Sequence, residues 1–439
     1  MIDQHQHSRP SLSCINCSSH SPRIWVALLW IVTLAGVSAR CTAQSEASAE
    51  ERFRRPIARP NIGDVLAWNG REYAPQRKAV FEVRDYDKAG VDCTGNTDSS
   101  AFLNSLTSTE DPTGTSWTIS TRDCPLLRAD HWVIHGQEYL ELDLGPLGPG
   151  YRPQGGTWLF GCSGRGAVLQ IDRSGYTYVH GGAIAANSVQ CPGHTSTLTG
   201  SIEYTNSGSG GYTSTHNTLA DTILTSGMNG EAIDGYRAYF INGTPNQEGF
   251  RLQNVLMLGQ NSPHSIGFYS NDENADSTTW DGGGASGFYR MVQMDAGRLR
   301  LLHTNNSFNG SYSIFGRGGA AIAQTIIGCV TEMVENVFDN SGTLIRSGTQ
   351  TSFGCNNYLR GNQASPTDID PSVHFIELGF QVGTDHMVDN NFSSGHSPPI
   401  LDNAIAGSVP DGGTGQVQVL DGDGNNLTND VGHVYKLHQ

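Results

Sequence analysis

The stretch FEVRDYDKAGVDCTGNTDSSAFLNSL, residues 81–106, decides how the chain begins its fold. Phe81 and Val83 alternate with charged residues, as in a strand that is buried on one face. A loop rich in Gly and Asp follows, and Asp98 then stands where the N-cap of a helix is expected. The apolar residues behind it, Phe102 among them, would lie on one face of a short helix. The segment therefore predicts a strand followed by a helix that can cover an apolar end.

The same segment resembles the opening motif of the pectate-lyase superfamily, V-x-D-[FY]-G-A-x-x-D-G-x-T-D-[DN]-T-x-A-[IF]. The matching positions are Val83, Asp85, Tyr86, Asp92, Thr97, Asp98, Ala101 and Phe102. Asp87 and Ser99 depart from the motif, and the loop has extra residues around Cys93. In that superfamily, and in the phage-tailspike-like proteins of the same architecture, the segment leads into a right-handed parallel β-helix. The resemblance implies an all-β solenoid over residues 81–406 with a short N-terminal capping helix.

Composition agrees with many short strands joined by tight turns. The 439 residues include 54 Gly, and only 15% of them are charged. The net charge of −16 argues against a nucleic-acid partner, because phosphate binding needs a basic surface. It also disfavours an anionic polysaccharide, unless a bound cation bridges the two.

The N-terminal region has the order of a secretory signal. Arg23 precedes the apolar run 24–37, which is shorter than the about 20 residues of a spanning helix. We therefore expect a signal peptide over residues 1–43, a polar linker over 44–60, and a secreted or cell-surface protein. The alternative is an uncleaved anchor; in either case the membrane is met only through this segment.

Residues 61–80 contain GDVLAWNGREYAP, which resembles a short unit of phage tail fibres and some secreted bacterial proteins. The Asn69-Gly70 pair between two apolar stretches predicts a hairpin. This hairpin is either an attachment module or a part that packs on the main domain. A homotrimer is the assembly that the tailspike-like resemblance would allow.

A loose asparagine pattern recurs in the second half of the chain. Each asparagine has an apolar, Thr or Cys residue two positions before it and an apolar residue two positions after it; the five are Asn254, Asn306, Asn336, Asn357 and Asn390. Asparagine tolerates left-handed turns and stacks its amide on the next rung, so the pattern favours coils of about 20 to 30 residues plus loops. The last segment, 407–439, is rich in Gly and Asp and is expected to be looser.

Six cysteines remain after signal cleavage, and an exported protein favours disulfides over free buried thiols. Residues one coil apart stack at about 4.8 Å, inside the about 4.4–6.8 Å Cα separation that a disulfide accepts. The sequence separations fit one coil each and predict the pairs Cys93–Cys124, Cys162–Cys191 and Cys329–Cys355.

Two acidic clusters between residues 230 and 305 are the candidate catalytic groups, the alternative being solvated loops. General acid–base chemistry needs carboxylates, and the candidates are Glu231, Asp234, Asp272 and Asp276. Aromatic faces stack on sugars and basic side chains bind their oxygens. The candidate substrate-binding residues are Tyr236, Arg237, Tyr269, Trp280, Arg290 and His303.

The expected function is that of an exported polysaccharide-active protein, either a glycoside hydrolase or a polysaccharide lyase. The alternative is a non-catalytic glycan-binding or surface-attachment protein of the same fold. A carboxylate pair about 5 to 10 Å apart would favour hydrolysis, whereas calcium ligands beside an arginine would favour elimination. Calcium is the one cofactor considered, and no metal site is assigned: the loop 421–426 lacks the glycine and the acid of a calcium loop, having Asn426 and Gly432 instead.

Overall fold

The computed structural model describes backbone and side chains over most of residues 80–306. Outside that range it describes the backbone of the strands within 64–77 and 307–438. Gaps within residues 80–306 lie at 109, 111–115, 149–151, 154, 208–213, 244–246, 273–274 and 276, and the side chains of 152–153 are also not described. The predicted signal peptide and linker lie outside the described residues.

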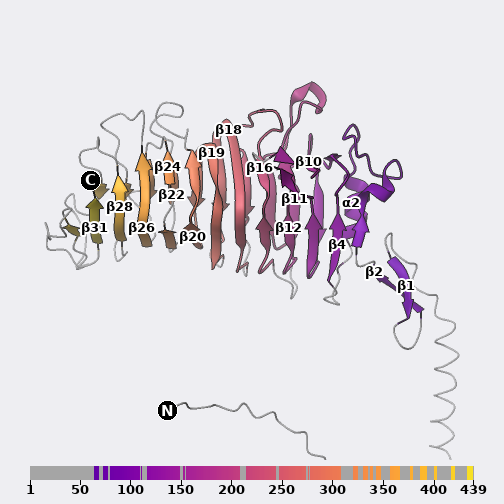
Figure 1. Ribbon diagram of the computed structural model, residues 1–439, viewed down its shortest axis with the longest axis horizontal. Coiled ribbons are helices and arrows are strands. Elements are labelled where there is room, and N and C mark those ends of the chain that lie inside the picture. The colour runs from indigo at the N-terminus through magenta and orange to yellow at the C-terminus, as the bar shows by residue number, and fades with distance from the viewer. Residues whose placement is uncertain are drawn as a thin grey trace, which may run out of the picture. The chain divides into compact units, whose positions relative to one another are not determined.

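The main body is a right-handed parallel β-helix (Figure 1), and every pairing in its large sheet is parallel. Leu169, for example, pairs with Trp132 of the preceding coil and with Ile202 of the next one. The fold class expected from the opening motif is therefore confirmed. Parallel pairing continues past residue 406, because the last strand, β31 (His433–His438), pairs with β28 (His386–Phe392).

Each coil contributes strands to three faces of the β-helix. The first face contains β6 (Trp132–His135), β11 (Ala167–Asp172), β14 (Gly200–Thr205), β17 (Arg237–Ile241), the C-terminal parts of β18 (Arg251–Ser270) and β19 (Thr278–Met294), β22 (Ala320–Gln324), β25 (Thr343–Ser347), β27 (Ile376–Leu378) and β29 (Ile400–Asp402).

The second and third faces are built in the same way. The second contains β3 (Val80–Glu82), β4 (Trp117–Ser120), β7 (Leu140–Asp143), β12 (Tyr178–His180), β15 (Thr218–Ala220), the N-terminal parts of β18 and β19, β20 (Arg298–Leu302), β23 (Val330–Val334), β26 (Asn356–Ser365), β28 and β31, with β30 (Val417–Leu420) paired to β31. The third contains β5 (Leu126–Arg128), β10 (Trp158–Phe160), β13 (Ala183–Ala185), β16 (Ile223–Thr225), the middle of β18 and β19, β21 (Asn305–Ser307), β24 (Val337–Asp339) and the end of β26.

The core consists of the side chains that point inward from these strands. On the second face one row runs through successive coils, and each member has an exposed fraction of 0%: Leu142, Val179, Leu219, Leu252, Trp280 and Leu301. Burying each such side chain contributes roughly 1.5–3 kcal/mol relative to leaving it in water. The residues between them point outward, because side chains alternate along a strand.

The N-terminal segment has the predicted helix, α2 (Ser100–Thr107), in which Leu103 and Leu106 are buried. The predicted strand differs: β3 ends at Glu82 and a 3-10 helix, Val83–Tyr86, follows. The N-cap is Ser99, but the Asp98 carboxylate still accepts the first-turn N–H of Ser100 at 3.0 Å. The opening motif therefore predicted the order of elements, and the boundaries moved by one or two residues.

Left-handed corners recur at one position in successive coils of the second face. Gly181, Asp221, Asn254 and Gly282 each follow the strand and have φ between 49° and 75°. The Asn254 amide donates to the Asp221 carboxylate at 2.8 Å, which is the rung-to-rung contact expected of the asparagine pattern. Asn306 differs, because it is fully buried and its Oδ1 accepts the N–H of Ala285. The side chains of the other three asparagines lie outside the described residues.

Two disulfides join neighbouring coils. Cys93–Cys124 and Cys162–Cys191 have Cα separations of 4.6 and 5.1 Å, and both pairs are the expected ones. The second bond adjoins the 3-10 helix Pro192–His194. Cys329 and Cys355 lie outside the described residues, so their pairing stays a prediction.

The segment at 64–77 forms an antiparallel hairpin, β1 (Asp64–Trp68) with β2 (Tyr73–Arg77). The predicted turn pair lies between these two strands. Within the described residues, none of the helices is long and apolar enough to cross a membrane.

Candidate functional site

A cavity of about 550 Å³ opens on the outward side of the second face, and we call it the groove. Its lining residues are Arg122, Asp143, Gly145, Pro146, Leu147, Gly148, His180, Gly181, Asp221 and Asn254. One side is built by the segment that contains β8 (Leu147–Gly148), which pairs antiparallel with β9 (Arg152–Pro153). The groove thus combines a flat parallel sheet with one inserted hairpin.

Strand register brings the polar residues of the groove together. Glu141 of β7 pairs with Tyr178 of β12, and Asp143 pairs with His180. These four positions share the outward side, whereas the residues between them, Leu142 and Val179, are fully buried. Neighbouring strands lie about 4.8 Å apart, so the four side chains form a compact square on the sheet.

Two glycines let the chain close beneath the groove. Gly145 and Gly181 have φ of 78° and 75°, and a Cβ on Gly181 would lie 1.9 Å from the Gly145 carbonyl oxygen. Gly182 donates its N–H to that same oxygen at 2.8 Å. Only glycine permits so close an approach with this backbone conformation.

His180 is held between two carboxylates. Its Nε2 lies 2.9 Å from Glu141 Oε1, and its Nδ1 lies 3.9 Å from Asp143 Oδ1. Glu141 also accepts the hydroxyl of Thr118 at 2.7 Å. These hydrogen bonds, with that of Thr118 the largest effect, lower the pKa of Glu141 despite its partial burial. Glu141 is therefore an ionised carboxylate that orients the imidazole ring.

The groove has an excess of negative charge. Asp143 pairs with Arg122 at 2.5 Å and accepts the N–H of Gly145 at 2.8 Å, so its charge is already compensated. Asp221 is a second carboxylate in the lining, Glu141 adds a third beside it through its contact with His180, and Arg122 is the one arginine or lysine among the lining residues. An anionic ligand would meet repulsion here, whereas a neutral or cationic ligand would not.

Tyr178 places an aromatic ring beside the groove, next to the lining residue His180. Its ring has an exposed fraction of 37% and stacks on His180 with centroids 4.6 Å apart. Partial burial, together with the carboxylates of Asp221, Glu141 and Asp143, raises the pKa of Tyr178. The phenol keeps its proton at neutral pH and is a hydrogen-bond donor to a ligand.

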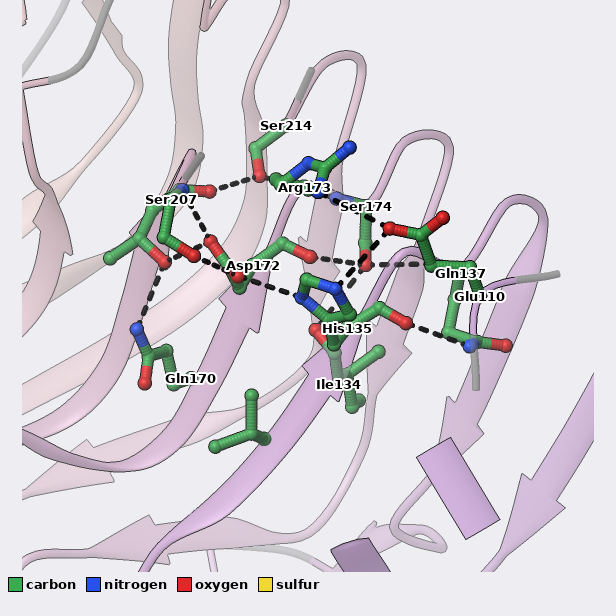
Figure 2. A network of polar contacts seen from close by, with 12 residues as sticks. Glu110, Ile134, His135, Gln137, Gln170, Asp172, Arg173, Ser174, Ser207 and Ser214 are labelled. Carbon is green, nitrogen blue, oxygen red and sulfur yellow. Dashed lines mark hydrogen bonds and ion pairs between the residues drawn. The ribbon is translucent and has the colours of Figure 1, made fainter. Parts of the chain in front are cut away.

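A second polar cluster lies on the first face, around Asp172 (Figure 2). Its Oδ1 accepts Thr205 Oγ1 and the Ser207 N–H, at 2.8 and 2.7 Å. Its Oδ2 accepts Ser207 Oγ at 2.5 Å and faces His135 Nδ1 at 2.8 Å. Burial opposes ionisation, but these hydrogen bonds outweigh it and lower the pKa of Asp172.

The same cluster extends to Glu110, whose carboxylate lies 3.4 Å from His135 Nε2 and 3.2 Å from Arg173. Figure 2 shows these side chains reaching between successive loops of the coil. Both oxygens of Asp172 are already bonded within the protein. We therefore interpret this cluster as a tether between loops, and the groove as the candidate site.

The first predicted acidic cluster lies in the loop before β17. Glu231 is half-buried, and its Oε2 accepts the N–H of Asn229 at 2.8 Å. Asp234 is exposed and pairs with the equally exposed His264 at 2.8 Å. The two carboxylates therefore bond to different partners.

In the second predicted cluster, Asp272 is only 2% exposed, so a substrate could reach very little of its side chain. Asp276 lies outside the described residues. His303, assigned as a substrate-binding residue, is exposed and pairs with Asp281 at 2.9 Å.

The expectation that Tyr236 and Trp280 bind substrate is wrong, because both have an exposed fraction of 0%. The Tyr236 hydroxyl lies 2.7 Å from Ser201 Oγ in the core. Trp280 occupies the inward row of the second face, and its Nε1 donates to the Gly282 carbonyl at 3.0 Å. Strand alternation placed the neighbour, Asp281, outward instead.

Arg237 and Tyr269 do come together, on the first face. The Arg237 guanidinium lies 4.5 Å from the Tyr269 ring centroid and 4.7 Å from that of Phe240. Tyr269 is 8% exposed and donates its hydroxyl to Asp295 at 2.5 Å. This cation–π stack is largely filled by the protein's own side chains.

Arg290 bonds to a neighbour on its own strand. Its guanidinium donates to Gln293 at 2.7 Å and lies 5.2 Å from the centroid of the Tyr289 ring. It lies two coils after Arg237, because Ile266 of the coil between them pairs with both residues.

Sequence reasoning missed the groove residues. A usable signal was present in two short strands, Glu141-Leu-Asp143 and Tyr178-Val-His180, in which polar residues alternate with a buried apolar one. Their alignment depends on the coil register, which the sequence does not state. In the described residues, no group of three or more His, Cys, Asp or Glu side chains has the geometry to hold a metal ion.

Comparison with known proteins gives structural neighbours only. No protein-family model and no curated protein matches the chain. Among solved structures, the Dettilon tailspike protein aligns with a TM-score of 0.40 and 12% identity, over 82% of this chain and 68% of that one. ORF18 of Geobacillus virus E2 aligns with a TM-score of 0.37 and 10% identity, over 75% and 68%.

Proposed function

We propose that this is an exported β-helix protein that binds a polysaccharide in the groove and hydrolyses it. The observation that carries the proposal is the convergence of Tyr178, His180 and Glu141 on the open face of a sheet beside a 550 Å³ cavity. A groove on an open sheet face suits an extended polymer. The exposed Tyr178 ring offers an apolar surface for sugar C–H groups, and the groove offers hydrogen-bonding partners for hydroxyls.

The charge of the groove supports a neutral or cationic glycan. Elimination acts on a sugar acid, whose carboxylate the surplus of Glu141 and Asp221 would repel. Hydrolysis has no such requirement, so the groove favours a glycoside hydrolase over a lyase. The protein's net charge of −16 also favours a neutral or cationic glycan over an anionic one.

Two carboxylates flank the strand that carries Tyr178. Glu141 comes from β7 on one side of β12, and Asp221 follows β15 on the other side. Hydrolysis of a glycosidic bond uses two carboxyl groups on opposite sides of the scissile bond. We assign the base role to the ionised Glu141, with its partner His180, and the general-acid role, which donates a proton to the leaving-group oxygen, to Asp221.

The test is a panel of glycans, assayed for new reducing ends and, separately, for unsaturated products. Wild-type protein should release reducing ends from a neutral or amino-sugar glycan, and Glu141→Gln and Asp221→Asn should each lose this activity. Asp85→Asn is the matched control, because Asp85 is an exposed acid outside the groove.

Three results would count against the proposal. Unsaturated products would indicate a lyase, and binding without cleavage would indicate the non-catalytic alternative. Loss of activity in Asp234→Asn, with Glu141→Gln fully active, would move the site to the loop before β17.

A further inference from the structure

Three aromatic rings form an exposed ladder at one corner of the coil, and we call it the aromatic ladder: Tyr139, Tyr176 and His216. The centroids of Tyr139 and Tyr176 are 4.9 Å apart, and those of Tyr176 and His216 are 5.1 Å apart. The planes of both pairs are within 15° of parallel. Each residue has a left-handed backbone, with φ between 54° and 57°, so the same corner repeats in three successive coils.

Backbone hydrogen bonds fix the rungs. The N–H of Tyr176 donates to Thr215 at 2.9 Å, and that of His216 donates to Glu248 at 2.7 Å. The next coil has Gly249 at this corner, where a Cβ would lie 3.0 Å from the His216 ring. The ladder therefore ends at His216, because the backbone of Gly249 packs closely against the His216 ring and leaves no room for a further side chain.

The ladder is a concentration of exposed aromatic surface. Tyr139 is 44% and Tyr176 is 46% exposed, and Tyr178 beside the groove is 37% exposed. Among the residues described by the structure, the only other exposed large hydrophobic residues are Val80 and Val189. Three of five such side chains thus lie within one small area.

The ladder and the groove are the two ends of one surface. Tyr176 lies two residues before the start of β12, whereas His180 ends that strand. The four residue steps from Tyr176 to His180 span at most about 13 Å. Tyr178 lies between them in the sequence and stacks on His180, so its ring stands between the ladder and the groove.

The chemistry of the ladder suits hydroxyl-rich polymers. Stacking already covers the inner ring faces, so the rings present edges, two phenol hydroxyls and an imidazole. In the described part of the chain, these polar atoms have no hydrogen-bond partner. They recur about every 5 Å along the coil axis, as the ring spacings show. Sugar hydroxyls can both donate to and accept from such a row.

We infer that the aromatic ladder is an extension of the glycan site, bound by the part of the polysaccharide that leaves the groove across Tyr178. This inference rests on the proposed function. It predicts that affinity rises with oligosaccharide length until the ligand reaches from the groove to the ladder.

The experiment compares wild-type protein with the double variant Tyr139→Phe/Tyr176→Phe by isothermal titration calorimetry. The ligands are oligosaccharides of increasing length, cut from the glycan that the panel identifies. Phenylalanine keeps the ring stack and removes only the hydroxyls. Short oligosaccharides should bind both proteins equally, whereas long ones should bind the variant several-fold more weakly, roughly two- to tenfold for each lost hydrogen bond.

Val189→Ala is the control, since it removes an exposed apolar side chain elsewhere and should bind like the wild type at every length. Equal length dependence in the double variant and the wild type would overturn the inference and leave the ladder a structural stack. A change in sedimentation without a change in glycan affinity would also overturn it, because the ladder would then join copies of the chain. Failure of the proposed function would give a different result. In that case Glu141→Gln would cleave the glycan as fast as the wild type, whether or not the ladder variant binds it normally.

Discussion

Replacement of Asp172 by alanine should destabilise the protein by about 3–5 kcal/mol, the range for removing one partner from a buried charged network. The carboxylate is 4% exposed and accepts four hydrogen bonds, from Thr205, from the backbone and side chain of Ser207, and from His135. A hydrogen bond to a charged group contributes about 1.5–3 kcal/mol. Ser207 is exposed and regains water in the variant, so the loss is well below the sum of four full bonds.

The pH dependence of the free energy of unfolding gives a sharper test. The pKa of Asp172 is lowered in the folded protein, so its contribution is fully present above the unfolded value of about 3.9. That contribution is lost as pH falls through the lower, folded pKa. Asp172→Asn has no such group. The difference in unfolding free energy between wild type and Asp172→Asn should therefore be largest near neutral pH and shrink in acid.

The assay is guanidinium unfolding followed by far-UV circular dichroism, at neutral pH and at several values below pH 4. Taking the difference between the two proteins cancels the contributions of the other acids. A difference that stays constant over the whole range, or a destabilisation below about 1 kcal/mol, which is the size of an exposed ion pair, would refute the tether around Asp172.

Three further predictions follow from single contacts. Serine at both Cys162 and Cys191 should cost about 2–4 kcal/mol in denaturant unfolding, the usual effect of opening a disulfide loop, and an unchanged midpoint would contradict the stapling of neighbouring coils. Gly181→Ala should unfold more easily and lose glycan binding, because its Cβ would lie 1.9 Å from a carbonyl oxygen; Gly155→Ala, with a similar φ but nothing within 4 Å, should lose less stability and keep binding. Trp280→Ala should cost about 3–5 kcal/mol without a specific loss of glycan affinity in the folded fraction, and a purely binding defect would show that the ring is accessible after all.

Much of the fold was readable from short-range patterns. The pattern around Asp98 predicted a strand, a loop and a helix in the right order, and the resemblance of this segment to the pectate-lyase opening motif implied the parallel β-helix. The spacing between Cys93 and Cys124 matched one coil of the expected β-helix, so separation and fold together predicted the pair. These inferences succeeded because each depends on residues within one coil, where the chain itself sets the distance.

The site was much less predictable, for two physical reasons. Along a strand, alternate residues point to opposite sides. If the strand register shifted by one residue, Asp281 would point into the core and Trp280 would point to the surface. The groove also depends on pairing between coils, which puts Asp143 beside His180 although a long inserted segment separates them. Coil lengths vary with such insertions, and no sequence pattern states which residues become neighbours.

The most direct test of the account is a crystal structure of the protein with the longest oligosaccharide that it binds, using Glu141→Gln to prevent cleavage. The account predicts sugar residues in the groove, in contact with Tyr178 and His180, and further residues over Tyr176. A ligand bound instead to the first face near Arg237, or to the loop that carries Asp234, with an empty groove, would contradict it.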